Sequence, residues 1–442
     1  MLGAVKTAPS SRSAVSLVAT VVRSVAVALA LVLVSGCAAA SAARAAKVLP
    51  RERPRSSAVA APQLAGRVAA AIVVDARDGH VLFAYRPDRA AAIASTTKLM
   101  TALLARERLS LDARVPAVRY HALPAESVLG LAPGERLAVR DLLAATLLAS
   151  ANDAAATLAR AVAGSQRAFV ELMNRRAREL GLKRTRFANP IGLDAAGAGS
   201  TARELAALAR VVLRDRFLAR VVAMPQALLV SRARRRIVTN RNDLVARYRW
   251  VDGVKTGHTS RAGYVLVASA HGRLGQRVLS VVLGSRSEGE RDRYSLALLR
   301  YGLALYGERT ALDPRRTRRR VHIAGTSATP TVVPARRRAV VVRRGQTLAV
   351  RLRVRPGLRA PLAARSAVGR FEVLVDGRRV ATEPALLATA VGSAGTFRAL
   401  DERLGSGLTL ALLGAMLAGA LAGLRSARAR RGTGRAEVDT GR

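Results

Sequence analysis

The order of the expected elements predicts an α+β fold. Two strands at 68–85 come first, several helices follow from residue 95 onward, and two antiparallel strands with a helix complete the segment at 263–307. Strands grouped on either side of a helical block, without strict alternation, are typical of α+β domains. A second group of short strands at 339–391, broken by Pro-Gly and Asp-Gly turns, predicts a small all-β domain.

Composition limits the classes of function. The 442 residues are enough for two or three domains, and the formal charge is +45, with 74 basic residues of which five are lysines and 69 arginines. This charge indicates either a solvated surface or attraction to anionic lipids and cell-wall polymers. We expect no nucleic-acid partner, because no basic element is interleaved with aromatics. Cys37 is the only cysteine, which excludes a disulfide framework and a cysteine-based metal site.

The N-terminus has the pattern of a secretory signal. A basic segment at 1–23 precedes a 13-residue uncharged apolar run at 24–36, and small residues follow at 38–43. We therefore predict a signal peptide at 1–43 and a linker rich in Pro, Ser and Arg at 44–62. The sequence at 34–37 resembles the lipobox of bacterial lipoproteins, so either Cys37 is lipidated or cleavage falls near Ala43. In both cases the rest of the chain is exported.

The segment 63–310 is the predicted main domain. Its expected elements are strands at 68–75 and 80–85, a helix from Ser95, helices at 141–163 and 169–180, a helix capped by Thr201, strands at 263–270 and 276–284, and a closing helix at 291–307. Polar residues interrupt the apolar helix 141–163 at 150–153, and such a contradiction marks either a kink or a site.

Composition shifts after this domain. We predict an Arg- and Pro-rich connector at 311–338, a small β-domain at 339–400 and a membrane anchor at 404–424, which has 21 residues without a charge. Arginines at 425, 428, 430 and 431 predict a cytoplasmic basic tail at 425–442. A core helix or an interfacial helix are the alternatives to a spanning anchor.

Ser95 and Lys98 form the first chemical motif. In a helix a serine and a lysine at i and i+3 lie one turn apart on the same face. A partly desolvated lysine can take the proton of the serine hydroxyl, which activates it as a nucleophile. Taken alone, this tetrapeptide is better explained as a helix start with a solvated lysine, because about 0.3 such Ser/Lys spacings arise by chance in this chain.

Two further motifs favour the catalytic interpretation of Ser95 and Lys98. Ser150-x-Asn152 and Lys255-Thr256-Gly257 follow in the order found in penicillin-binding proteins and serine β-lactamases. Lys-Thr-Gly alone is expected about 0.02 times by chance in such a chain. The chain resembles the serine D-Ala-D-Ala carboxypeptidases of the penicillin-binding protein 5 type, peptidase family S11, over nearly its whole length. The matching stretches are 94–101, 150–154, 189–193, 240–244, 251–259 and 262–264.

The resemblance implies a β-lactamase/transpeptidase-like catalytic domain, an antiparallel sheet with a helical subdomain, in which Ser95 forms the acyl-ester. Lys98 is then its base, and needs a pKa lowered by burial and by a nearby cation, which Lys255 supplies. Ser150 relays the proton to the leaving D-Ala amine, and Asn152 holds an amide of the substrate. No cofactor or metal is implied.

The remaining residues carried over by the resemblance bind substrate. Thr256, helped by Arg291, holds the terminal carboxylate, and Gly257 lets the substrate lie against the strand. The backbone N–H groups of Ser95 and His258 form the oxyanion site. The side chain of His258 is a bystander, because the Ser/Lys pair already provides the base.

The implied function is hydrolysis of D-Ala-D-Ala in peptidoglycan stem pentapeptides, with acylation by β-lactams, on the outer face of the bacterial plasma membrane. A DD-endopeptidase, a serine β-lactamase and a non-catalytic penicillin-binding scaffold are the alternatives. Glu171-x-x-Asn174 is superficially similar to the deacylating motif of class A β-lactamases, but it lies on an ordinary helix too close to Ser150.

Overall fold

The computed structural model describes residues 60–64, 66–231, 234–326, 328–392 and 406–432. The predicted signal peptide, Cys37, nearly all of the 44–62 linker and the end of the basic tail, 433–442, lie outside the described residues.

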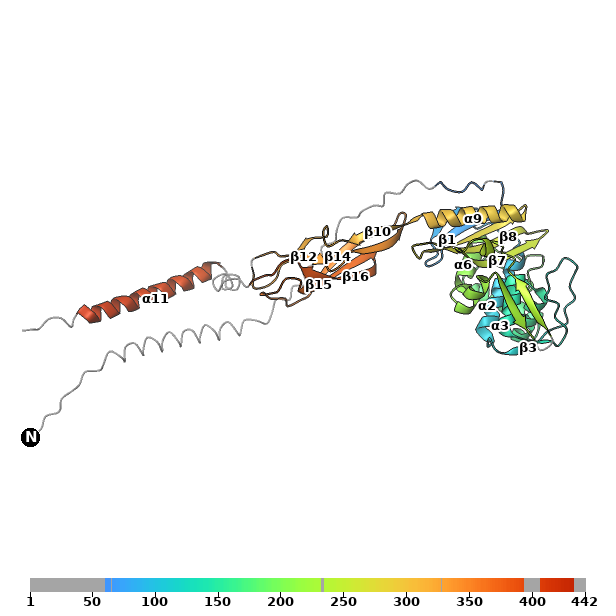
Figure 1. Cartoon of the computed structure of the whole chain (residues 1–442), viewed down its shortest axis with the longest axis horizontal. Coiled ribbons are helices and arrows are strands. Elements are labelled where there is room, and N and C mark those ends of the chain that lie inside the picture. The colour runs from blue at the N-terminus through green and yellow to red at the C-terminus, as the bar shows by residue number, and fades with distance from the viewer. Residues whose placement is uncertain (1–59, 65, 232–233, 327, 393–405, 433–442) are drawn as a thin grey trace, which may run out of the picture. The chain divides into compact units, whose positions relative to one another are not determined.

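The first sheet has five antiparallel strands in the order β2-β1-β9-β8-β7 (Figure 1). The strands are β1 Ala70–Asp75, β2 Val81–Tyr85, β7 Val251–Thr259, β8 Gly263–His271 and β9 Arg277–Ser285. Alternate residues of β1 enter two different cores: Ile72 and Val74 belong to one cluster and Ala71 and Val73 to the other. The sheet is therefore buried on both faces, with β7 at one edge.

Helices cover both faces of this sheet (Figure 1). The helical subdomain on one face contains α2 Lys98–Arg108, α3 Val139–Ala144, α4 Asn152–Ala163, α5 Gln166–Glu179, α6 Ala202–Val212 and α7 Arg216–Val222. α9, Glu288–Ala304, packs on the other face through Leu298 and Leu299, and the short α8, Leu244–Arg247, also contributes to this second core. The predicted α+β class is confirmed.

Local signals in the sequence account for several helix ends. The expected interruption of 141–163 is confirmed: α3 passes into the π-turn η2, Ala145–Ala149, Ser150 adopts a left-handed φ of 61°, and α4 begins at Asn152. Thr201 caps α6 by accepting a hydrogen bond from the backbone N–H of Glu204 at 3.1 Å.

Two hairpins were not anticipated from the sequence. β3 Arg114–Pro116 pairs with β4 Arg136–Ala138, and β5 Gln226–Val230 pairs with β6 Arg235–Thr239. The strands of the first hairpin hold only three residues each, too few for an alternating pattern to stand out.

The second sheet contains β11 Arg319–Arg320, β12 Thr331–Pro334, β14 Leu348–Val354, β15 Ala367–Val375 and β16 Arg378–Leu387, in the order β11-β12-β16-β15-β14. β10 Tyr306–Leu312 pairs separately with β13 Arg338–Arg343. The interpretation of 311–338 as a plain connector is thus wrong, because β11 and β12 lie in it and Val332 is fully buried. Short strands among Pro and Arg gave no readable period.

The predicted anchor at 404–424 falls largely within α11, Ser406–Gly432. Within the described residues, no helix combines the length and the apolar character needed to cross a membrane. The prediction of a spanning helix at 404–424 is therefore not confirmed.

Candidate active site

Ser95 lies in a 3₁₀ turn, η1 Ala94–Thr97, immediately before α2. Ala94 has a φ of 47°, a left-handed conformation that an L-residue keeps only when its surroundings enforce it. The Thr96 hydroxyl donates to the Ile93 carbonyl at 2.6 Å and so closes the turn. The turn presents the partly exposed Ser95 at the start of the buried helix.

Lys98 is fully buried and donates two hydrogen bonds. Its Nζ lies 2.9 Å from Ser95 Oγ and 2.6 Å from the carbonyl oxygen of Ile191. Burial, together with the positive charges of Lys255 and Arg241, lowers the pKa of Lys98 well below its ordinary value, against the opposing charge of Glu126. A neutral amine beside the hydroxyl is what proton abstraction from Ser95 requires.

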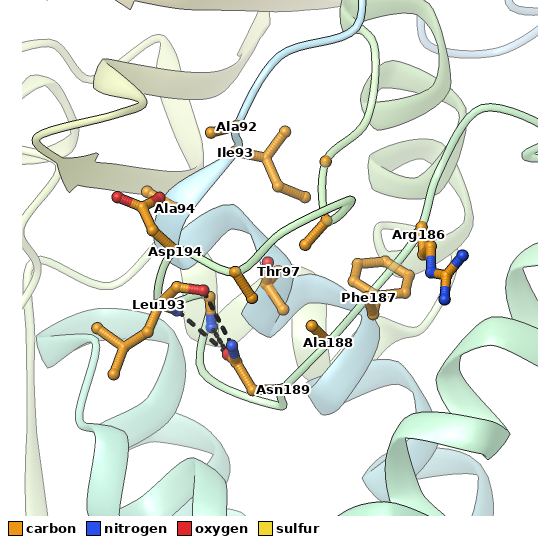
Figure 2. Close-up of a pocket in the computed structure, with 14 residues that line it drawn as sticks. Ala92, Ile93, Ala94, Thr97, Arg186, Phe187, Ala188, Asn189, Leu193 and Asp194 are labelled. Atoms are coloured by element: carbon orange, nitrogen blue, oxygen red, sulfur yellow. Dashed lines mark hydrogen bonds between the residues drawn. The ribbon is translucent and has the colours of Figure 1, made fainter.

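The loop 189–193 holds Lys98 in place, a role that the sequence did not reveal. Asn189 Oδ1 accepts hydrogen bonds from the backbone N–H groups of three following residues: Ile191 at 3.2 Å, Gly192 at 2.6 Å and Leu193 at 3.1 Å. Figure 2 shows this loop facing Ala94 and Thr97 across a small pocket beside the nucleophile turn. The signal available was the Asn-Pro-x-Gly composition, which marks an ordered turn.

Ser150 and Asn152 flank the break between η2 and α4, and both side chains are buried. Asn152 Nδ2 donates to Glu126 Oε2 at 2.6 Å, and its backbone N–H donates to the Ser127 carbonyl at 2.7 Å. Glu126, on the loop between β3 and β4, is another residue that sequence reasoning missed.

β7 carries the third motif along the edge of the sheet. Lys255 is 1% exposed, and its Nζ donates to the Thr256 carbonyl at 3.0 Å. Burial and the charges of Arg241 and Arg291 lower the pKa of Lys255 to about 7. An edge strand has free backbone groups to which an extended peptide can bind.

Gly257 is also required by the packing of the strand on the nucleophile turn. A Cβ at this position would lie 3.0 Å from both the Ala94 Cβ and the Ser95 backbone nitrogen, so the strand packs tightly against the nucleophile turn. The exposed ring of His258 stacks on Tyr264 with 4.1 Å between ring centroids.

Arg291 lies in the first turn of α9 and is 2% exposed. Its guanidinium is 2.7 Å from Glu288 and 2.8 Å from Asp292, so both carboxylates compete for it. Its charge nevertheless acts on Lys255. Among the described residues, no three His, Cys, Asp or Glu side chains converge as metal ligands would.

The antiparallel sheet with its helical subdomain is the penicillin-binding, transpeptidase-like α+β fold of the solved structures that the chain resembles, and it brings Ser95 and Lys98 into a hydrogen bond. The family model for D-alanyl-D-alanine carboxypeptidase matches residues 56–287, just over half of the chain. The chain therefore belongs to the D-alanyl-D-alanine carboxypeptidase family.

Individual relatives are similar over most of their length. The chain is 28% identical to the D-alanyl-D-alanine carboxypeptidase DacF of Bacillus subtilis, covering 78% of this chain and 90% of that one. It is 32% identical to DacC of Escherichia coli, covering 77% and 87%. Penicillin binding protein 5 from Haemophilus influenzae superposes with a TM-score of 0.54 at 28% identity, covering 76% of this chain and all of that one. The Streptomyces K15 DD-transpeptidase gives 0.53 at 30% identity, covering 56% of this chain and all of that one.

Proposed function

We propose that this chain is a serine D-Ala-D-Ala carboxypeptidase that removes the terminal D-Ala from peptidoglycan stem pentapeptides and is acylated by penicillins. The observation that carries the proposal is the 2.9 Å hydrogen bond between Ser95 Oγ and the Nζ of a fully buried lysine. The family membership and the named carboxypeptidase relatives support the choice of substrate.

Acylation is the first half of the reaction. Ser95 Oγ attacks the carbonyl carbon of the penultimate D-Ala while Lys98 takes the hydroxyl proton. The backbone N–H groups of Ser95 and His258 stabilise the oxyanion. Cleavage of the C–N bond releases D-Ala, whose amine receives the proton from Lys98 by way of Ser150. Water then hydrolyses the ester, with the same lysine as its base, and regenerates Ser95.

Substrate binding uses the edge strand and the residues that face it. The stem peptide lies along β7, Thr256 and the protonated Lys255 bind its terminal carboxylate, and Asn152 accepts a hydrogen bond from its backbone amide. Arg291 adds positive charge behind Lys255, and it remains a helper because two carboxylates already engage it.

The test compares Ser95→Ala with Ser110→Ala in the full chain, since Ser110 is an exposed serine at the end of the next helix. We expect Ser95→Ala to abolish both covalent labelling by a fluorescent penicillin and D-Ala release from a D-Ala-D-Ala pentapeptide, while Ser110→Ala keeps both. Wild-type protein that labels but releases no D-Ala from the pentapeptide would refute the carboxypeptidase and leave a scaffold. Rapid turnover of the penicillin would instead favour a β-lactamase, and preferential cleavage of cross-linked dimers an endopeptidase.

For location, we propose export and association with the outer face of the plasma membrane. The support is the signal-like segment 1–43 and the uncharged segment 404–424 followed by arginines. Carbonate extraction of membranes, with a 1–403 truncation as control, tests the association. A mass measurement of the mature N-terminus distinguishes lipidation at Cys37 from cleavage near Ala43.

A further inference from the structure

Glu126 contributes a negative charge to a site whose other charges acting on Lys98 are positive. Glu126 lies on the loop between β3 and β4, where its Oε2 accepts hydrogen bonds from Asn152 Nδ2, at 2.6 Å, and from the hydroxyl of Tyr120. Its other oxygen accepts from the backbone N–H of Leu123 at 3.2 Å. The carboxylate is thus held on three sides and faces the second active-site motif.

The loop that carries Glu126 is itself tied to the start of α4. The Ser127 carbonyl accepts from the backbone N–H of Asn152 at 2.7 Å. The buried carboxylate of Asp153 accepts from the backbone N–H groups of Leu129, at 2.9 Å, and Leu131, at 3.0 Å. Glu126 and Asn152 are therefore fixed to each other through backbone and side-chain bonds together, which is how precise sites are supported.

The bond to Glu126 decides which end of the Asn152 amide is available. A carboxylate only accepts hydrogen bonds, so the amide nitrogen must turn toward Glu126 and the amide oxygen away from it. The oxygen is the atom that can accept a hydrogen bond from a backbone amide of a peptide substrate. Without the carboxylate, either orientation of the amide becomes accessible.

The charge of Glu126 also acts on the general base, Lys98. The charged groups that act on Lys98 are Lys255 of β7, Arg241 after β6, and Glu126, which alone among these three is negative. Burial on its own would raise the pKa of Glu126, but the hydrogen bonds from Tyr120 and Asn152 and the charge of Lys98 outweigh it and lower that pKa. Glu126 is therefore an anion at neutral pH.

Tyr120 is the other titratable group in contact with Glu126. Burial and the neighbouring carboxylates of Glu126 and Asp153 raise the pKa of Tyr120, so its hydroxyl stays protonated and continues to donate to Glu126.

We propose that Glu126 is a positioning residue of the peptidase site: it orients the Asn152 amide for the substrate and balances the positive charges around Lys98. The inference rests on the proposed function. Two substitutions separate the orienting effect from the charge effect. A glutamine at position 126 keeps a carbonyl that can accept a hydrogen bond from Asn152 but removes the charge, whereas an alanine removes both.

The experiment measures the rate constant for acylation of the full chain by a fluorescent penicillin from pH 5 to 9. Ser95 needs a neutral Lys98, so the rate rises with pH as Lys98 loses its proton. Removing a nearby negative charge favours the neutral amine. We therefore expect Glu126→Gln to shift this acid limb to lower pH by about half a unit or more, with a plateau close to that of the wild type. Glu126→Ala shows the same shift, and its plateau falls by about tenfold or more.

Glu171→Gln is the matched control, because it removes one exposed carboxylate from α5 and leaves the limb where it is. An unshifted limb in Glu126→Gln overturns the electrostatic role. A plateau in Glu126→Ala equal to that in Glu126→Gln overturns the positioning role, as does an unchanged KM for D-Ala-D-Ala peptides in Glu126→Ala. If the wild type itself is not acylated, the proposed function fails instead, and the two failures are distinguishable.

Discussion

Gly192 is where the packing of the site can be tested most directly. It has a φ of 86°, and a Cβ added there would lie 2.5 Å from the carbonyl carbon of Ala94, closer still to its oxygen, and 3.0 Å from Thr97 Oγ1. The obstacle is backbone, which cannot rotate away as a side chain can. Gly192→Ala therefore has to push the 189–193 loop away from the nucleophile turn.

The loss of folding stability expected for Gly192→Ala has two separable contributions. An L-residue in the left-handed region costs about 1–2 kcal/mol, and overpacking against an immobile neighbour adds about 1–3 kcal/mol. Gly181→Ala isolates the first term, because Gly181 has a φ of 74° and a Cβ added there would meet no atom within 4 Å. For a domain of this size each kcal/mol lowers the melting temperature by about 2–4 °C.

We expect Gly192→Ala to lower the melting temperature about 1.5 to 4 times as far as Gly181→Ala in thermal unfolding monitored by circular dichroism. It should also slow penicillin acylation by about tenfold or more, because the moving loop carries the Ile191 carbonyl that holds Lys98. Gly181→Ala should acylate at the wild-type rate. Equal losses of stability in the two variants, or a normal acylation rate in Gly192→Ala, would refute the close approach of loop and turn.

Three further outcomes are expected. Lys98→Arg should label with fluorescent penicillin at least about 100-fold more slowly than wild type, because arginine keeps its proton and cannot serve as the base; labelling within tenfold would contradict the assigned role. The KM for a D-Ala-D-Ala peptide should rise as the pH increases above about 7. Burial and nearby arginines lower the pKa of Lys255 to about 7, so above that pH Lys255 loses the charge that holds the carboxylate. A KM that stays constant from pH 6 to 9 would exclude this role of Lys255. Thr201→Ala should reduce the free energy of unfolding by about 1 kcal/mol, because the cap that accepts from the backbone N–H of Glu204 is lost, and it should leave the acylation rate normal. An unchanged denaturation midpoint would show that the cap does not contribute to stability.

The part of the site visible in the sequence is the local part. Ser95 and Lys98 were expected one turn apart on the same face, and a hydrogen bond of 2.9 Å joins them. The break at Ser150 was also predictable, because a run of polar residues within an apolar helical stretch indicates an interruption. The hydrogen-bond partners of Lys98 and Asn152 were not predictable. Ile191 and Glu126 are 93 and 26 residues away from them and lie in loops that have no hydrophobic periodicity.

The fold was predictable to a similar depth. Long alternating strands such as β8 and β9 were evident in the sequence, and their pairing gave the α+β class. The failures concern segments in which tertiary packing, rather than local pattern, decides the structure. β12 holds four residues next to arginines and prolines, and only its pairing with β16 makes it a strand. At Gly257 the sequence did not reveal the close approach of the nucleophile turn, because Ala94 and Ser95 are distant from it along the chain.

The use of lysine and arginine separates two kinds of buried cation in this chain. Arg291 and Arg343 are 2% and 6% exposed, and each lies within 3.2 Å of two carboxylates, as a charge that is never lost requires. Lys98 and Lys255 are buried still more deeply, yet the hydrogen bonds of their Nζ atoms go to a hydroxyl and to backbone carbonyls. Such a setting stabilises a neutral amine as well as a cation, and only lysine can become neutral there. With 69 arginines and five lysines in the chain, a lysine at position 98 indicates a requirement for a removable proton, because the base that activates Ser95 has to become neutral.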